Sequence, residues 1–220
     1  MADDGAMAED DIGAHEVFLV PASMRQPAED LGPRAHRTIA RILDAARQVF
    51  LTNGYSGATI DDIARVAEMS RASIYTYFPS KRDVMLAAGA RSATQAEAVI
   101  DRARELVTSK AGAIQWVTEY FKYLELHGSF AFAWTEAAHD DNEIRNAGMK
   151  RHLRLCARVG SALADARGAS VGDPTALGLA ISSLFERSWS YGALYGPSMD
   201  AERLHVAVGR LVWSVTQGLD

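Results

Sequence analysis

Residues 70–81, SRASIYTYFPSK, have the features of a short helix with one buried face and one polar face. Ser70 can cap this helix, because its hydroxyl can accept a hydrogen bond from a free backbone N–H in the first turn. Ile74 and Phe78 lie four residues apart, so they share a face that is expected to pack inward. Pro79 ends the helix, since proline lacks a backbone donor and disfavours helix in the preceding residue. We therefore predict a helix over residues 71–78.

A second short helix is predicted just before this stretch, starting at Thr59 in the run TIDDIARVAEMS. Asp62 follows Thr59 by three residues, which gives a capping box with the shorter side chain of Asp in place of the usual Glu or Gln. Apolar residues recur through this helix on one face, and a turn of three to four residues at 67–70 separates it from the next helix. Two short helices joined in this way indicate a helix-turn-helix, whose second helix enters the DNA major groove.

Residues 40–84 resemble the DNA-binding domain of TetR/AcrR-type transcriptional regulators. The matching segments are ILDAARQVFLTNGYSGATIDDIA and MSRASIYTYFPSKRDVM. The family pattern is met by the helix-start Thr59, the pair Ile63-Ala64, the Ser70 cap, the run 74–78 and Lys81. Glu68 departs from the pattern, because the family often has glycine in this turn, where glycine would allow a positive φ at little cost.

The resemblance implies a role for each matching residue in binding double-stranded operator DNA. The residues expected to face bases are Arg71, Ala72, Ser73 and Thr76, and those expected to hold phosphates are Thr59, Tyr75, Tyr77 and Lys81. Arg71 is the best candidate for a bidentate guanine contact. The resemblance also implies a dimer, because this family dimerises through its last two long helices.

The net charge of −5 would argue against nucleic acid, but its distribution does not. Residues 1–33 carry a charge of −7, residues 34–83 carry +3 and residues 84–220 carry −1. The one positive segment is therefore the candidate DNA-binding domain, as electrostatic contact with phosphates requires. Three of its cations, Arg34, Arg37 and Arg41, are as well explained by phosphate contact as by a solvated helix face.

The chain has no apolar run long enough for a membrane helix and no basic, apolar N-terminal signal, so we expect no membrane association and a cytoplasmic location. The one cysteine, Cys156, excludes an internal disulfide and fits a reducing compartment. It lies on the apolar seam of a predicted helix, where buried packing is a better explanation than redox sensing.

The predicted fold is all-α, because helical periodicity recurs throughout and no alternating strand pattern is found. We predict a disordered N-terminal extension over residues 1–33, a three-helix DNA-binding domain over 34–80, and a helical ligand-binding and dimerisation domain over 81–220. The helices predicted outside residues 59–78 span 34–53, 81–109 with a possible break at Gly89, 113–127, 130–139 after Gly128, 142–167, 174–195 and 200–217.

The last of these helices is apolar on more than one face, with Leu211 and Val215 on its main stripe and Trp213 elsewhere. Such a helix is usually buried on more than one side. A symmetric homodimer through the last two helices would provide the second surface.

Aromatic residues are frequent in the C-terminal part and have two interpretations, ordinary core packing or the lining of an apolar ligand cavity. The candidate ligand contacts are Trp116, Tyr120, Tyr123, Trp134, Phe185 and Trp189. Glu119, His152 and Arg154 are candidate polar anchors. An apolar or aromatic effector, or an acyl chain with a polar head, fits this composition better than a highly charged one.

Glu136, His139, Asp140 and Glu143 have spacings that a metal site can use, but a solvated helix end explains them better. No catalytic spacing or phosphate-binding glycine loop is found, so we expect neither an enzyme nor a cofactor. The sequence thus predicts a ligand-responsive repressor that an effector releases from a palindromic operator. The alternatives are an all-helical enzyme or carrier of apolar molecules, and an architectural DNA binder.

Overall fold

The computed structural model describes residues 31–219, and all of the secondary structure in this range is helical. The predicted extension over residues 1–33 falls almost wholly outside it. The elements are α1 (Pro33–Gly57), α2 (Ile60–Val66), α3 (Arg71–Tyr77), α4 (Lys81–Asp101), α5 (Ala103–Leu106), α6 (Lys110–Asp140), α7 (Asn142–Arg167), α8 (Pro174–Tyr195), the 3-10 turn η2 (Gly196–Ser198) and α9 (Ala201–Thr216). The all-α prediction is confirmed.

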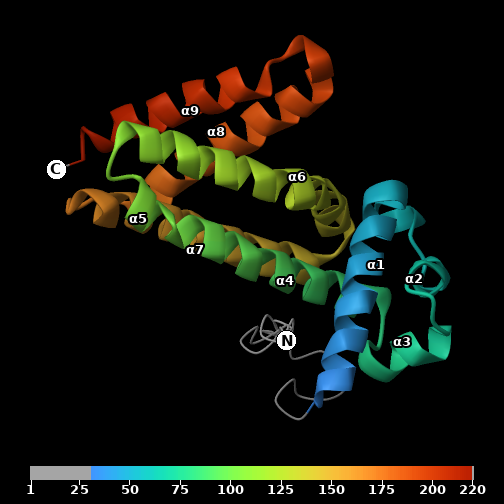
Figure 1. The fold of residues 1–220 in the computed structure, drawn as a ribbon. Helices are drawn as coiled ribbons and strands as arrows, with labels where there is room; N and C mark the ends of the chain where they lie inside the picture. Colours follow the sequence, from blue (N-terminus) through green and yellow to red (C-terminus); the bar gives the residue numbers. More distant parts are fainter. Residues whose placement is uncertain (1–30, 220) are drawn as a thin grey trace, which may run out of the picture.

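The helices bury two apolar clusters, one at each end of the molecule (Figure 1). The first joins α1, α2 and α3 to the start of α4 and to the C-terminal part of α6, where Phe130 and Ala133 contribute. The second lies among α4, α6, α7, α8 and α9, around Trp116 and Phe185. Because α4 and α6 take part in both clusters, they connect the small helices to the larger helical body.

Side-chain caps define where most of the helices begin. Thr59, Ser70, Ser80 and Ser109 each accept a hydrogen bond from the backbone N–H three residues later, at the starts of α2, α3, α4 and α6. Asp173 caps α8 in the same way, with Ala176 N donating over 3.0 Å. These caps satisfy donors that a helix start otherwise leaves unpaired.

Two predicted helix breaks, at Gly128 and possibly at Gly89, were wrong. Helix α6 runs through Gly128, and α4 runs through Gly89 but ends at Asp101 rather than at residue 109, and the short helix α5 follows it. Both glycines are places of close approach, because a Cβ atom at Gly128 would lie 2.7 Å from the Trp189 ring and one at Gly89 would overlap the Trp134 ring. These two positions therefore hold glycine because the neighbouring tryptophan rings leave no room for a side chain, and not because the helix breaks there.

Candidate nucleic-acid interface

Helix α2 begins with the capping box that the sequence predicts. The Thr59 hydroxyl accepts from Asp62 N at 3.1 Å, and Asp62 Oδ2 accepts from Thr59 N at 3.2 Å. The Thr59 hydroxyl also donates to Asp62 Oδ2 over 2.6 Å. These hydrogen bonds, with a further one from Arg65, lower the pKa of Asp62. Ile60, Ile63 and Ala64 are buried, so α2 is fixed against α1.

The turn between α2 and α3 contains backbone that a non-glycine residue rarely adopts. Glu68 has a φ of 52°, and it is the one non-glycine residue with a positive φ in the described part of the chain. Arg41 Nη2 in α1 supports this turn by donating to Ala67 O over 2.6 Å. The left-handed conformation costs a non-glycine residue about 1–2 kcal/mol, which explains why glycine suits this position.

Helix α3 has a buried face and an exposed face, as the spacing predicts. Ile74 and Phe78 are fully buried against the first apolar cluster. Arg71, Ala72 and Thr76 are exposed. Helix α3 lies at the outer edge of the molecule (Figure 1). A short helix anchored on one side and open on the other can enter a DNA groove as a rigid element.

The remaining predicted DNA contacts of α3 are half-buried. Ser73, Tyr75 and Tyr77 have intermediate exposure, and the two tyrosines pack against the first cluster. Ser73 Oγ lies 2.8 Å from Ser70 Oγ at the helix start. These side chains therefore combine a structural contact with an accessible polar group.

Arg71 is held by neighbours on its own surface. Its Nη2 donates to the Tyr75 hydroxyl over 3.3 Å, and its Nη1 lies 3.2 Å from Asp61. The Tyr75 hydrogen bond and the Asp61 charge raise the pKa of Arg71. Both partners are accessible, so DNA can replace Asp61 without opening the core.

Lys81 lies further inward than a phosphate contact requires. Its Nζ donates to Tyr55 O over 2.7 Å and to Ala58 O over 2.9 Å, and it lies 4.4 Å from the centre of the Tyr55 ring. Burial lowers the pKa of Lys81, and Glu136 opposes this effect. In this structure the Lys81 ammonium group thus holds the connection between α1 and α2.

Carboxylates of the C-terminal helices contact the same region, which local sequence patterns did not predict. Glu136 in α6 accepts hydrogen bonds from Tyr55 N at 2.8 Å and Ser56 N at 3.1 Å. At the start of α4, Arg82 Nε donates to Asp141 over 2.5 Å and Nη1 donates to Glu143 over 3.2 Å. We call Glu136 and Lys81, which both contact residues 55–58, the interdomain clamp. Among residues 31–219, no group of three or more potential ligands is arranged to hold a metal ion.

The Glu136 contact predicts a pH dependence of stability. Hydrogen bonds from Ser56 and Tyr55 lower the pKa of Glu136 from 4.5, so its stabilisation is present above about pH 4.5 and is lost as the pH falls through the lower, folded-state value. Replacing Glu136 with Gln should lower the urea midpoint at pH 7 and reduce the loss of stability between pH 5 and pH 3. Glu125→Gln on the exposed side of α6 is the matched control. Equal pH profiles for Glu136→Gln and wild type would contradict the prediction.

Five of the six predicted effector contacts lie in the second apolar cluster or pack against it. Trp116 and Phe185 are fully buried with ring centroids 5.4 Å apart, and Tyr120 contacts both. Tyr123 lies beside Tyr120, with centroids 5.8 Å apart. Trp189 packs against this cluster, whereas Trp134 packs against the first one. In this conformation the rings fill space with edge-to-face contacts, which are favourable for aromatic pairs.

The candidate polar anchors are at the surface. Glu119 pairs with Arg102 at 2.6 Å, while His152 and Arg154 are exposed on α7. Cys156 is buried, as its seam position predicts, and burial raises the pKa of its thiol. Among residues 31–219, no helix has the length and apolar character needed to cross a membrane.

Comparisons with known proteins agree with the geometry of α1–α3. Residues 42–88 match the family described as "Bacterial regulatory proteins, tetR family". The chain is 42% identical over 60 residues to the HTH-type transcriptional regulator SrpR of Pseudomonas putida, and 41% identical over 44 residues to the negative transcriptional regulator IcaR of Staphylococcus aureus. These matches cover 27% and 20% of this chain, and 28% and 24% of the relatives.

The fold likeness extends over most of the chain. The transcriptional regulator FadR from Bacillus subtilis, solved in complex with stearoyl-CoA, superimposes with a TM-score of 0.59 at 20% identity. The superposition covers 80% of this chain and 97% of that protein. These similar proteins are named as transcriptional regulators.

Proposed function

We propose, from the match of residues 42–88 to the tetR family of bacterial regulatory proteins, that the chain is a cytoplasmic, sequence-specific transcriptional repressor of this family. The observation that carries the proposal is helix α3. It exposes Arg71, Ala72 and Thr76 while Ile74 and Phe78 anchor it in the core. We take residues 34–80 as the DNA-binding domain and 81–220 as the regulatory domain. The name of IcaR as a negative regulator supports repression over activation.

The proposed DNA contacts are those of the sequence prediction. Arg71, Ala72, Ser73 and Thr76 would face bases, and Thr59, Tyr75 and Tyr77 would contact phosphates. Lys81 would reach DNA only if it released at least one of its two carbonyl partners. One short helix reads too few bases for operator affinity, whereas two helices held about one turn of DNA apart can read a palindrome.

A homodimer through α8 and α9 would hold two such helices in register. Helices α8 and α9 expose several large apolar side chains: Leu179, Tyr191, Leu194, Tyr195, Leu211 and Val215. Neighbouring residues of α9, Val208 and Val212, are buried toward the rest of the chain, so the helix is apolar on two sides. Exposed apolar surface of this extent is typical of a protein interface.

Leu211→Asp tests this interface. Burying a leucine side chain is worth about 1.5–3 kcal/mol, and a symmetric dimer loses it twice. We expect the dimer dissociation constant to rise at least about 100-fold, measured by sedimentation velocity. Leu126→Asp is the control, because Leu126 is 61% exposed on α6 and Leu211 is 53% exposed on α9. A Leu211→Asp protein as dimeric as the control would refute the α8–α9 interface.

The effector is proposed to be an apolar or aromatic molecule, with an acyl compound as the first candidate because FadR was solved with stearoyl-CoA. It would enter the C-terminal body by displacing rings among Trp116, Tyr120, Tyr123, Phe185 and Trp189, with Trp134 at the junction. An effector can shift the conformation only through different affinities for the two states. The interdomain clamp is the proposed route, because it joins α6 directly to the connection between α1 and α2.

Fluorescence anisotropy tests the proposed function. The purified protein is titrated onto DNA from upstream of its own gene and onto a scrambled sequence, at a series of salt concentrations. We expect tight, palindrome-dependent binding that weakens steeply with salt, because phosphate contacts release counterions. If the operator lies elsewhere, selection of bound DNA from a pool of random sequences would identify it. If neither the upstream DNA nor any selected sequence is bound more tightly than scrambled DNA, the proposal is wrong.

A further inference from the structure

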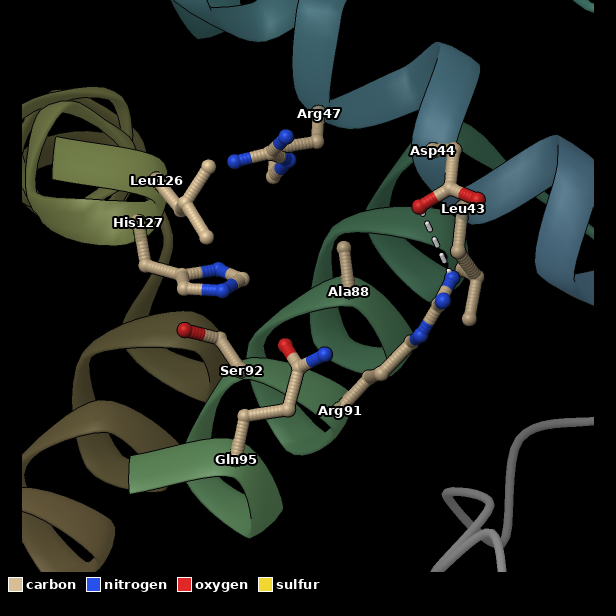
Figure 2. Close-up of a pocket in the computed structure, with 9 residues that line it drawn as sticks. All are labelled: Leu43, Asp44, Arg47, Ala88, Arg91, Ser92, Gln95, Leu126 and His127. Carbon is tan, nitrogen blue, oxygen red and sulfur yellow. Dashed lines mark hydrogen bonds and ion pairs between the residues drawn. The ribbon is translucent and has the colours of Figure 1, made fainter. Parts of the chain in front are cut away.

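A small cavity of about 180 Å³ lies between α1, α4 and α6, outside the aromatic cluster. Leu43, Ala88 and Leu126 supply its apolar walls (Figure 2). Arg47 from α1 and His127 from α6 point toward each other across it. The cavity is therefore lined by both the proposed DNA-binding domain and the helices that carry the regulatory domain.

His127 has an unsatisfied polar atom at this cavity. Its Nδ1 is buried and has no hydrogen-bond partner in the described part of the chain. The ring cannot turn freely, because it stacks on Tyr123 with centroids 4.8 Å apart and an interplanar angle of 24°. Buried polar atoms are almost always paired, so an unpaired one at a cavity wall indicates a ligand group that the protein itself does not supply.

The charges around His127 favour an anion. Arg47 forms no ion pair with any carboxylate among residues 31–219, whereas Arg91 lies 3.0 Å from Asp44 (Figure 2). Burial, together with the positive charges of Arg47 and Arg91, lowers the pKa of His127 to about 4, and the negative charge of Asp44 opposes this effect. Tyr123 is the remaining titratable group in contact with the ring. The imidazole is thus kept neutral mainly by burial, and the positive charge beside it is only partly balanced.

The size of the cavity limits the ligand. A volume of about 180 Å³ is below the range of roughly 300–1,000 Å³ for drug-sized ligands, but it exceeds the cavity of about 150 Å³ that accepts benzene in another protein. A single ring or a short chain therefore fits, whereas a long acyl chain does not. The apolar walls suit the body of such a ligand and the Arg47–His127 pair suits a carboxylate.

We propose that this cavity binds a small monocarboxylate with a compact apolar body, whose carboxylate accepts hydrogen bonds from Arg47 and from Nδ1 of His127. Arg47 supplies the forked donor geometry that matches a carboxylate. The ligand would contact α1, α4 and α6 at once, and so would bridge the two proposed domains. This site adjoins the aromatic cluster proposed for the acyl effector, because Tyr123 of that cluster stacks on His127, but none of the cluster's aromatic rings lines the cavity.

Isothermal titration calorimetry of the full chain with benzoate, butyrate and inorganic phosphate tests the proposal. We expect benzoate to bind with a dissociation constant of about 1 mM or tighter, with phosphate weaker. Arg47→Gln should weaken benzoate at least about tenfold, since it removes a charge-assisted pair. The control Lys122→Gln removes a cation from the exposed surface of α6 and should bind as wild type does.

The pH dependence provides a second readout. A bound carboxylate favours protonated His127, so benzoate binding should take up a proton and strengthen from pH 7.5 to pH 5.5. His127→Gln should abolish this dependence. In wild type, the ¹⁵N-labelled His127 ring signals should shift on saturation.

Phosphate binding without carboxylate binding would overturn the proposal. The proposal would also be wrong if neither benzoate nor butyrate bound at concentrations below 10 mM. It would be wrong as well if Arg47→Gln and wild type bound benzoate with equal affinity. The titrations require no DNA, so their failure would leave the proposed repressor function intact.

Discussion

Arg71→Ala is expected to lower operator affinity about 30-fold or more, while affinity for scrambled DNA falls far less. A good bidentate contact to guanine is worth about 1–3 kcal/mol of discrimination, and a dimer on a palindrome loses two of them. Arg71 is exposed at the first position of α3, and its present partners Asp61 and Tyr75 are at the surface. Anisotropy titrations on operator and scrambled DNA at one salt concentration measure both affinities.

The control for Arg71 is Lys150→Ala, which removes one positive charge from the exposed surface of α7. It should leave the ratio of operator to scrambled affinity unchanged. An equal loss on both DNAs for Arg71→Ala would assign Arg71 to phosphate contact rather than to base reading. Retention of full operator affinity would exclude it from the interface.

Gly178→Ala is expected to lower the free energy of unfolding by about 3 kcal/mol, the upper end for overpacking a core. Helices α7 and α8 approach most closely here. A Cβ atom at Gly178 would overlap the backbone carbonyl of Cys156, whose carbon would lie 2.5 Å away. Backbone cannot rotate aside as a side chain can, so the two helices would have to separate. The difference in free energy of unfolding between the variant and wild type is measured by urea unfolding, monitored by circular dichroism at a fixed protein concentration.

Gly192→Ala in the same helix is the matched control. Its Cβ atom would lie 3.3 Å from a terminal methyl group of Leu204, which can adjust. The change should be neutral or stabilising by up to about 1 kcal/mol, because alanine favours a helix interior over glycine. Similar destabilisation by both substitutions would show that helix packing at Gly178 is not the cause.

The parts of the fold that follow local rules were predictable from the sequence. The bounds of α3 were predicted to within one residue. The prediction used the Ser70 cap, the inward Ile74 and Phe78 and the stop at Pro79, and each of these depends on neighbours within a single turn. The family pattern also pointed to the unusual backbone at residue 68. Glu68 adopts the positive φ that a glycine would adopt more easily.

What the sequence did not reveal depends on residues far apart in the chain. Glu136 accepts from Tyr55 N across 81 positions, and no helical periodicity encodes such a contact. The same holds for Lys81, which points to the α1–α2 connection, and for the cavity between Arg47 and His127. Gly89 and Gly128 were misassigned for a related reason, since the tryptophan rings that require them lie elsewhere in the sequence.

The packing of Trp134 has a spectroscopic consequence. Its ring fills the space beside Gly89 of α4 and Gly148 of α7, with the Arg151 guanidinium 5.9 Å from the ring centre. Helix α4 cannot slide along α6 or α7 without changing the surroundings of this indole. A protein that keeps Trp134 and has phenylalanine at its other three tryptophan positions would report movement of α4 as a change in emission wavelength. The chain thus contains its own fluorophore where α4, α6 and α7 meet, beside the proposed route between effector and DNA.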